Sequence, residues 1–184
     1  ILVLVVLINS IFYLEGFAQQ DAQYTQYMYN TLSFNPAYAG QRDVLSIVGL
    51  HRTQWVGIEG APRTQTISLH SPVGFSNRVG LGLSIVNDDI GPTHETNFDI
   101  VFSYTIPVSD EGKFSFGLKA GGHLLDVAFS ELRPFQRDDQ LLQSDIDNKF
   151  SPNIGLGLYY RSSDKWYLGL SAPNILETKH FDRN

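Results

Sequence analysis

Apolar residues alternate one by one with small or polar residues through most of this sequence. The clearest segment is 97–107, NFDIVFSYTIP, in which every second side chain is large and apolar. A period of two places successive side chains on opposite faces of a β-strand. One face of this segment would carry Phe98, Ile100, Phe102, Tyr104 and Ile106. The other face would carry Asn97, Asp99, Val101, Ser103 and Thr105.

Three more segments show the same division, namely 78–87 (RVGLGLSIVN), 113–121 (KFSFGLKAG) and 153–161 (NIGLGLYYR). Glycine, serine and lysine fall on the face opposite the apolar one, and lysines there imply contact with water. Less regular strands are expected at 44–54, 63–71 and 165–171, which brings the total to about seven.

The predicted connections alternate in length. The shorter ones are SPVGFSNR, VSDEGK and SSDK, and the longer ones are VGIEGAP, NDDIGPTHE and ELRPFQRDDQLLQSDIDNKFS. Outer-membrane barrels have short periplasmic turns, longer outer loops and strands with an apolar lipid face. The sequence therefore predicts an all-β fold, an antiparallel transmembrane outer-membrane β-barrel. Because such barrels normally have an even strand count, we expect an N-terminal fragment, truncated at both ends.

An exported soluble β-sandwich is the alternative fold, because its strands also alternate. A sandwich would bury large side chains on both inner faces, whereas one face here is rich in glycine. Aromatic residues near the strand ends also favour a barrel, since they suit the membrane interfaces. These residues are Trp55, Tyr104, Tyr160 and Trp166.

The chain begins with an apolar run of 14 residues, ILVLVVLINSIFYL, which is shorter than a membrane-spanning helix. Small residues at Gly16 and Ala18 follow it, so we expect a signal peptide over residues 1–18 that directs export. The predicted organisation continues with a periplasmic N-terminal segment at 19–43 and a partial barrel at 44–184.

Charge and spacing exclude several functions. The chain has 13 Lys and Arg against 19 Asp and Glu, and its basic residues are scattered, which argues against nucleic-acid binding. The five histidines form no metal-binding pair, and SDIDNK lacks the glycine and glutamate of a calcium loop. Adjacent Asp88 and Asp89 predict a turn or cap role rather than acid/base chemistry. We expect no metal, no cofactor and no enzymatic activity.

Four motifs occur in order: FNPAYAG, HRTQWVGIEGAPRTQTISLHSPV, GLGLSIVNDDIGP and PNIGLGLYYRSSDKWYLGLSAPNIL. Together they resemble the PorP/SprF family of type IX secretion and gliding-motility membrane proteins, from about Asp21 to the C-terminus. The resemblance implies a non-enzymatic outer-membrane barrel beside periplasmic and outer-membrane subunits of the machinery, in some members helping to export or display a surface protein. Family chains are longer than this one.

The segment AQYTQYMYNTLSFNPAYAG lies between the predicted signal and the first strand. A short helix is expected to end before Pro36, and Gly40 allows the turn into the strand. Its aromatic residues suit either a plug in the barrel mouth, which we favour, or a docking patch for a periplasmic partner. The candidate contacts are Tyr24, Tyr27, Met28, Phe34, Asn35, Pro36, Tyr38 and Gly40.

The block TQWVGIEGAPRT follows the first strand on its outward end. It predicts a tight hairpin with an interfacial tryptophan, or a surface contact with an exported partner. The candidate residues are Trp55, Gly57, Gly60 and Pro62.

The leading hypothesis for function is a membrane anchor and assembly surface for the secretion and gliding machinery, in contact with outer-membrane lipid. A diffusion channel or transporter is the alternative, because Lys113 and Lys119 could line a wet lumen. A secreted soluble binding module remains the third possibility.

Overall fold

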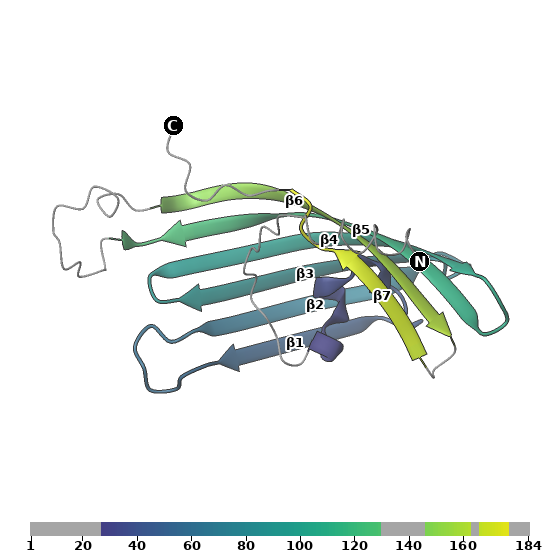
Figure 1. Cartoon of the computed structure of the whole chain (residues 1–184), viewed down its shortest axis with the longest axis horizontal. Helices are drawn as coiled ribbons and strands as arrows, with labels where there is room; N and C mark the ends of the chain where they lie inside the picture. Colours follow the sequence, from purple (N-terminus) through teal and green to yellow (C-terminus); the bar gives the residue numbers. More distant parts are fainter. Residues whose placement is uncertain (1–26, 130–145, 163–165, 177–184) are drawn as a thin grey trace, which may run out of the picture.

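The computed structural model describes residues 27–129, 146–162 and 166–176. Seven antiparallel strands form one sheet in the order β1-β2-β3-β4-β5-β6-β7, so each strand pairs with its neighbour in sequence. The sheet curls into a half-barrel (Figure 1). The strands are β1 (Ser46–Thr53), β2 (Arg63–Val73), β3 (Val79–Ile90), β4 (Thr93–Pro107), β5 (Gly112–Val127), β6 (Ile146–Ser162) and β7 (Trp166–Ala172). The predicted fold class is confirmed, as a fragment of an all-β outer-membrane barrel.

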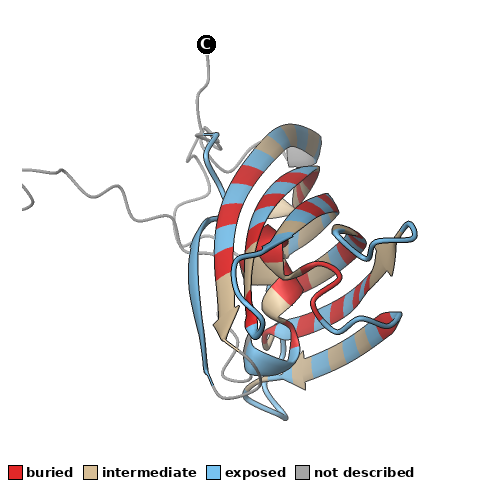
Figure 2. Ribbon diagram, turned by 90° about the vertical axis from the view of Figure 1, so that its right-hand side faces the viewer, coloured by how far each residue is buried: buried red, intermediate tan, exposed pale blue. Residues whose placement is uncertain are grey.

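The two faces of the sheet reverse the usual pattern of a water-soluble protein. The convex face carries large apolar side chains that remain exposed, among them Ile85, Ile100, Phe102, Leu118 and Leu156. The concave face carries small and polar side chains that are buried, among them Thr66, Ser68, Ser84, Ser103 and Ser115. Figure 2 shows this alternation along most of the strands, whereas β7 is exposed throughout. A continuous exposed apolar sheet face is stable against lipid, not water.

The apolar rows of the convex face form a belt of limited height, which we call the apolar belt. On β4 it extends from Phe98 to Ile106, about 27 Å along the strand, or about 20 Å at the usual tilt of barrel strands. Its outermost row is Ile67, Ile85 and Phe98. The next row outward is polar, with Gln65, Asn87 and Thr96 side by side. The belt is therefore close to the height of the lipid-facing band of a barrel.

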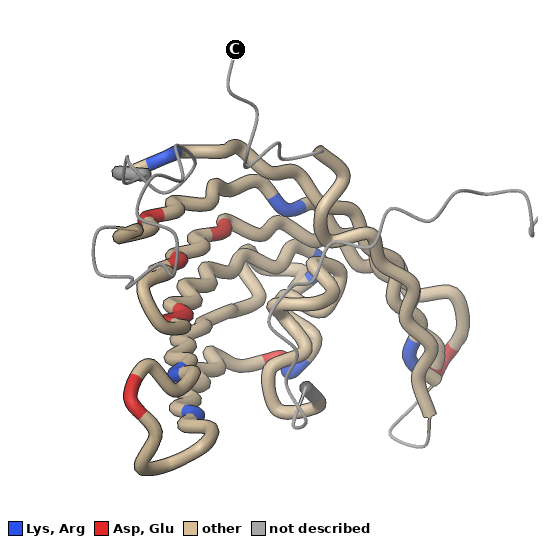
Figure 3. The backbone as a smooth tube through the Cα atoms, turned by 60° about the vertical axis from the view of Figure 1, so that its left-hand side comes forward, with Lys and Arg blue, Asp and Glu red and all other residues tan. Residues whose placement is uncertain are grey.

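Charged side chains gather beyond this polar row, at the end of the sheet that holds the β1–β2 and β3–β4 connections (Figure 3). There Arg63 pairs in register with Asp89, and Asp89 lies 2.7 Å from His94. No helix within the described ranges is long and apolar enough to cross a membrane.

The structure corrects the predicted connection NDDIGPTHE. Strand β3 runs to Ile90 and β4 starts at Thr93, so only Gly91 and Pro92 lie between them. The predicted turn role of Asp88 and Asp89 is wrong for the same reason. Asp88 is buried on the concave face, where it accepts a hydrogen bond from the Thr64 hydroxyl at 2.5 Å. Strand β5 also continues six residues past its predicted end at 121, and β6 begins seven residues before its predicted start at 153. The other strand ends differ from prediction by two residues or fewer.

Candidate functional site

The described N-terminal segment, residues 27–45, lies inside the concave face. It consists of three short turns, η1 (Tyr27–Tyr29), α2 (Thr31–Phe34) and η2 (Pro36–Tyr38). Asn35 between α2 and η2 is extended, with φ −133° and ψ 108°, because proline disfavours the helical conformation in the residue before it. The predicted end of a helix before Pro36 is therefore correct. The notion of a short helix over AQYTQYMYN concerns residues 22–30, of which 22–26 lie outside the described residues, and the described part contains the short helical turn η1.

A row of small residues on the sheet makes room for this segment. Gly80, Ser103, Gly117 and Gly157 are neighbours in the strand register, and we call them the small-residue row. A Cβ atom at Gly117 would overlap the backbone of Pro36 and Ala37. The small-residue row therefore lets the backbone of residues 35–39 lie directly on the sheet.

Hydrogen bonds join the N-terminal segment to five strands. Asn35 is central, because its Oδ1 accepts from the Ala37 backbone at 2.9 Å and its Nδ2 donates to the Leu158 carbonyl at 2.9 Å. The Ser103 hydroxyl donates to the Ala39 carbonyl at 2.6 Å, and the Arg161 guanidinium donates to the Gln41 carbonyl at 2.7 Å.

Further bonds fix the two ends of the segment. The Gln41 amide donates to Ser115 at 2.5 Å and to Thr105 at 3.1 Å. The Gly40 backbone donates to Nδ1 of His70 at 3.1 Å, and the Ser68 hydroxyl donates to Asn30 at 2.7 Å. The N-terminal segment and the sheet therefore provide hydrogen-bond partners for each other's buried polar groups, as a stable interior requires.

Apolar and aromatic contacts complete the interface. Leu32, Ala39 and Val101 form a small buried cluster. The Tyr38 ring meets those of His70 and Tyr159 edge-on, at centroid distances of 5.4 and 5.6 Å. The interface is thus mainly polar, with a minor apolar core.

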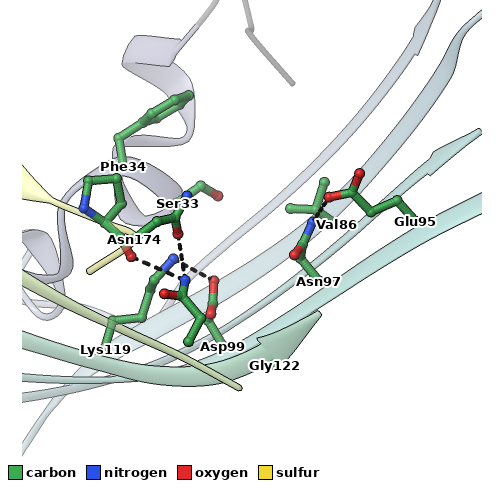
Figure 4. A pocket seen from close by; sticks show the side chains of 11 residues that line it. Ser33, Phe34, Val86, Glu95, Asn97, Asp99, Lys119, Gly122 and Asn174 are labelled. Carbon is green, nitrogen blue, oxygen red and sulfur yellow. Dashed lines mark hydrogen bonds and ion pairs between the residues drawn. The ribbon is translucent and has the colours of Figure 1, made fainter. Parts of the chain in front are cut away.

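A cavity of about 90 Å³ lies between α2 and the strands, on the side of the small-residue row that is nearer the β3–β4 turn. Ser33 and Phe34 border it from the segment, and Figure 4 shows Lys119 and Asp99 pointing toward each other beneath them. Lys119 is 5% exposed, and its Nζ lies 3.0 Å from the Asp99 carboxylate. Charged and amide side chains form part of the cavity lining, yet no group of three or more His, Cys, Asp or Glu in the described residues is placed to hold a metal.

The structure brings most of the predicted segment contacts together. Asn35, Pro36 and Gly40 are buried against the sheet, and Tyr38 packs on His70. Met28 is exposed. Tyr24 lies outside the described residues, and Tyr27 is described only as part of η1. These positions do not test whether the segment serves as a plug or a docking patch.

The predicted outer contacts lie in the loop of residues 54–62, which we call the outer loop. Trp55 is exposed, whereas Pro62 is buried and its carbonyl accepts from the Gln54 backbone at 3.0 Å. Gly57 and Gly60 have φ of 95° and 73°, which glycine adopts readily. The outer loop and the N-terminal segment are therefore separate features of the molecule.

Several contacting residues had no clear signal in the sequence. Gln41, Asn30 and Ser33 look like ordinary polar residues of a connecting segment. Their partners lie dozens of residues away along the chain, as with Gln41 and Ser115. The glycines at alternate positions in three strands were the one available hint that a second backbone lies on that face.

Asn35→Ala tests the central contact of the segment. We expect it to lower the free energy of unfolding by about 2 kcal/mol, because a helix cap and a buried hydrogen bond are both lost. Urea unfolding in detergent micelles measures this change. Thr31→Ala is the matched control, since its hydroxyl bonds only within the segment at an exposed site. Equal effects of the two variants would contradict the assigned contact.

Comparison with known proteins supplies the family. A family model described as type IX secretion system membrane protein PorP/SprF matches residues 16–184. Searches of curated proteins and of solved structures gave no significant match. The match covers every described element and agrees with the exposed apolar face of the sheet. The chain therefore belongs to the PorP/SprF family of type IX secretion system membrane proteins.

Proposed function

We propose that this protein is a plugged outer-membrane barrel that serves as a non-enzymatic anchor and assembly surface for the type IX secretion machinery. Family membership supports a place in that machinery, and the apolar belt supports contact with lipid. In this proposal the protein binds periplasmic and outer-membrane subunits and helps exported proteins reach the cell surface. Neither solutes nor cargo pass through its lumen.

The observation that carries the proposal is the position of the N-terminal segment. Its backbone contacts the small-residue row, and its hydrogen bonds reach β2, β3, β4, β5 and β6. A segment bonded to five strands occupies the space that a channel would need for solutes. It also stiffens the barrel wall, which suits a protein that works as a platform.

The proposed orientation follows from the connections. The longest one joins Val127 of β5 to Ile146 of β6, and these two strand ends lie at the same end of the sheet as the outer loop. At the opposite end the connections are short, as between Val73 and Val79, whereas the outer end combines two long loops with the two-residue β3–β4 turn. Outer-membrane barrels carry long loops outside and short turns in the periplasm. The outer loop therefore faces the cell exterior, and export requires the signal peptide expected at residues 1–18.

A diffusion channel or transporter is the rival function, and the cavity that holds the Lys119–Asp99 ion pair is the feature that favours it. A transporter would need the N-terminal segment to leave the lumen during each cycle. The two functions therefore differ in whether that segment moves.

A disulfide between the N-terminal segment and the sheet distinguishes the anchor from the transporter. The Ser33 and Ser84 hydroxyl oxygens are 3.2 Å apart, so cysteines there need only a small shift to reach the S–S distance of about 2 Å. The chain has no cysteine of its own, and the periplasm is oxidising. We expect the oxidised Ser33→Cys/Ser84→Cys protein to support secretion of a type IX cargo within twofold of wild type.

The two single-cysteine variants are the controls for side-chain loss. Loss of secretion in the oxidised double variant, restored by a reductant, would show that the segment has to move and would favour the transporter.

Deletion of residues 20–29 addresses the docking alternative. A deleted protein that still shifts on heating in a gel but no longer co-purifies with its partner subunits would establish docking instead of plugging.

A further inference from the structure

The outer loop has a defined conformation that backbone hydrogen bonds hold in place. Inside the closing pair of Gln54 and Pro62, the Ile58 backbone donates to the Trp55 carbonyl at 3.1 Å, and the Ala61 backbone donates to the Ile58 carbonyl at 3.3 Å. The Gly91 backbone of the β3–β4 turn donates to the Gly60 carbonyl at 3.0 Å, which ties the two hairpins together. A loop held at this many points presents its side chains in fixed positions.

Its most exposed side chains are apolar. Trp55, Val56 and Ile58 are 68%, 85% and 62% exposed, and we call these three residues the apolar knob. Adjacent exposed apolar side chains on a rigid loop typically mark a contact surface. Tryptophan in particular is enriched among the residues that dominate the energy of protein interfaces.

Lipid is a poor occupant for the apolar knob, because the apolar belt ends well before it. Arg63, at the base of the outer loop, is four residues beyond Ile67 in the outermost apolar row. That separation is about 13 Å along the strand. The polar row that contains Gln65 lies between the apolar belt and the outer loop. The charged row of Arg63, Asp89 and His94 follows it, at the base of the loop.

The charges around the apolar knob indicate the kind of partner. At this end of the described sheet the acidic side chains that are not buried, Glu59, Asp89, Glu95 and Asp126, outnumber the basic side chains Arg52, Arg63 and Lys149. Complementary charge favours a partner surface with basic side chains. Glu59 belongs to the outer loop itself, so a basic group beside the bound knob would meet it directly.

We infer that the apolar knob docks into an apolar pocket, edged by basic side chains, on a protein at the outer surface of the cell. The inference rests on the proposed orientation of the barrel. It assigns the partner to the outside, whereas the N-terminal segment faces the lumen. It also gives Trp55 a role in binding a protein in place of an interfacial role in lipid.

Single cysteines test this inference, because the chain has no native thiol to compete. Val56→Cys reports on the apolar knob. His94→Cys is the matched control, since it is exposed at the same end of the sheet but lies outside the outer loop. A membrane-impermeant maleimide then measures the accessibility of each site, on intact cells and on purified protein in vesicles of lipopolysaccharide and phospholipid.

In the vesicles, both cysteines should label at rates within twofold of each other. On intact cells, Cys at position 56 should label at least fivefold more slowly than Cys at position 94. Adding Glu59→Lys should restore most of the labelling on cells, because it places like charge against the basic rim of the partner. Protection of position 56 in vesicles would overturn the inference in favour of lipid, and equal rates on cells would overturn it in favour of a free surface.

The proposed function can fail separately in the same experiment. If position 94 labels only after the cells are permeabilised, the orientation is reversed, and both the proposed topology and this inference are wrong. If position 94 labels on intact cells, the orientation holds, and the rate at position 56 alone decides the inference.

Discussion

Replacing Gly117 by valine should displace residues 35–39 from the sheet and lower the free energy of unfolding by about 3 kcal/mol. The side chain would overlap the backbone of Pro36 and Ala37, and a backbone held by a proline cannot move locally without losing its neighbouring hydrogen bonds. Urea unfolding in micelles measures the stability. Planar-bilayer recording should also detect stable conductance in this variant, because the displaced segment opens the lumen.

Gly49→Val is the matched control for that prediction. Gly49 lies in β1, and a Cβ atom there would meet nothing within 4 Å. The control should retain wild-type stability to within about 0.5 kcal/mol, since surface substitutions rarely change more. Gly117→Ala offers a smaller insertion at the original site if valine prevents folding. If the Gly117→Val protein were as stable as the control and showed no conductance, the N-terminal segment would not lie on the small-residue row.

Replacing Phe102 by lysine should make insertion into lipid less favourable by about 2–4 kcal/mol, the cost of a charged residue at the centre of a barrel's lipid face. Phe102 lies in the middle of the apolar belt, between Leu81 and Leu118 in register, and is 44% exposed. In a water-soluble protein a half-exposed phenylalanine tolerates lysine well. The large cost is expected only if this face contacts hydrocarbon.

Gln65→Lys is the control, because Gln65 occupies the polar row just outside the apolar belt. A lysine near the membrane surface costs about 0–1 kcal/mol. Folding into phospholipid vesicles, followed by the gel shift between heated and unheated protein, gives both values. Equal effects of the two lysines would argue that the convex face is not in lipid.

Alternation of side chains predicted the strands and their faces because lipid and lumen impose different chemistry on successive residues. The prediction was most accurate where this contrast is strongest, as along β4 from Phe98 to Ile106. It was wrong at the β3–β4 connection, where Asp88, Asp89 and Glu95 are strand residues. Those strands continue beyond the apolar belt, and there both faces are polar, so the pattern that identifies a strand disappears.

The candidate site was predictable only in its local features. The Asn-Pro pair and Gly40 predicted a stiff turn, and the structure contains it. The partners of that turn were not predictable, because Asn35 contacts Leu158 and Gly40 contacts His70 across the fold. Such contacts depend on the curvature and register of the sheet. The outer loop was predicted as a hairpin, but its tie to Gly91 depends on two hairpins meeting in space.

Single-channel recording of the wild-type protein in planar bilayers tests the plugged-barrel account most directly. The account predicts no stable conductance steps from wild type and clear steps from Gly117→Val, because the N-terminal segment fills the lumen until the small-residue row is disrupted. Stable conductance from the wild-type protein, unchanged by Gly117→Val, would contradict the plug and identify the protein as an open channel.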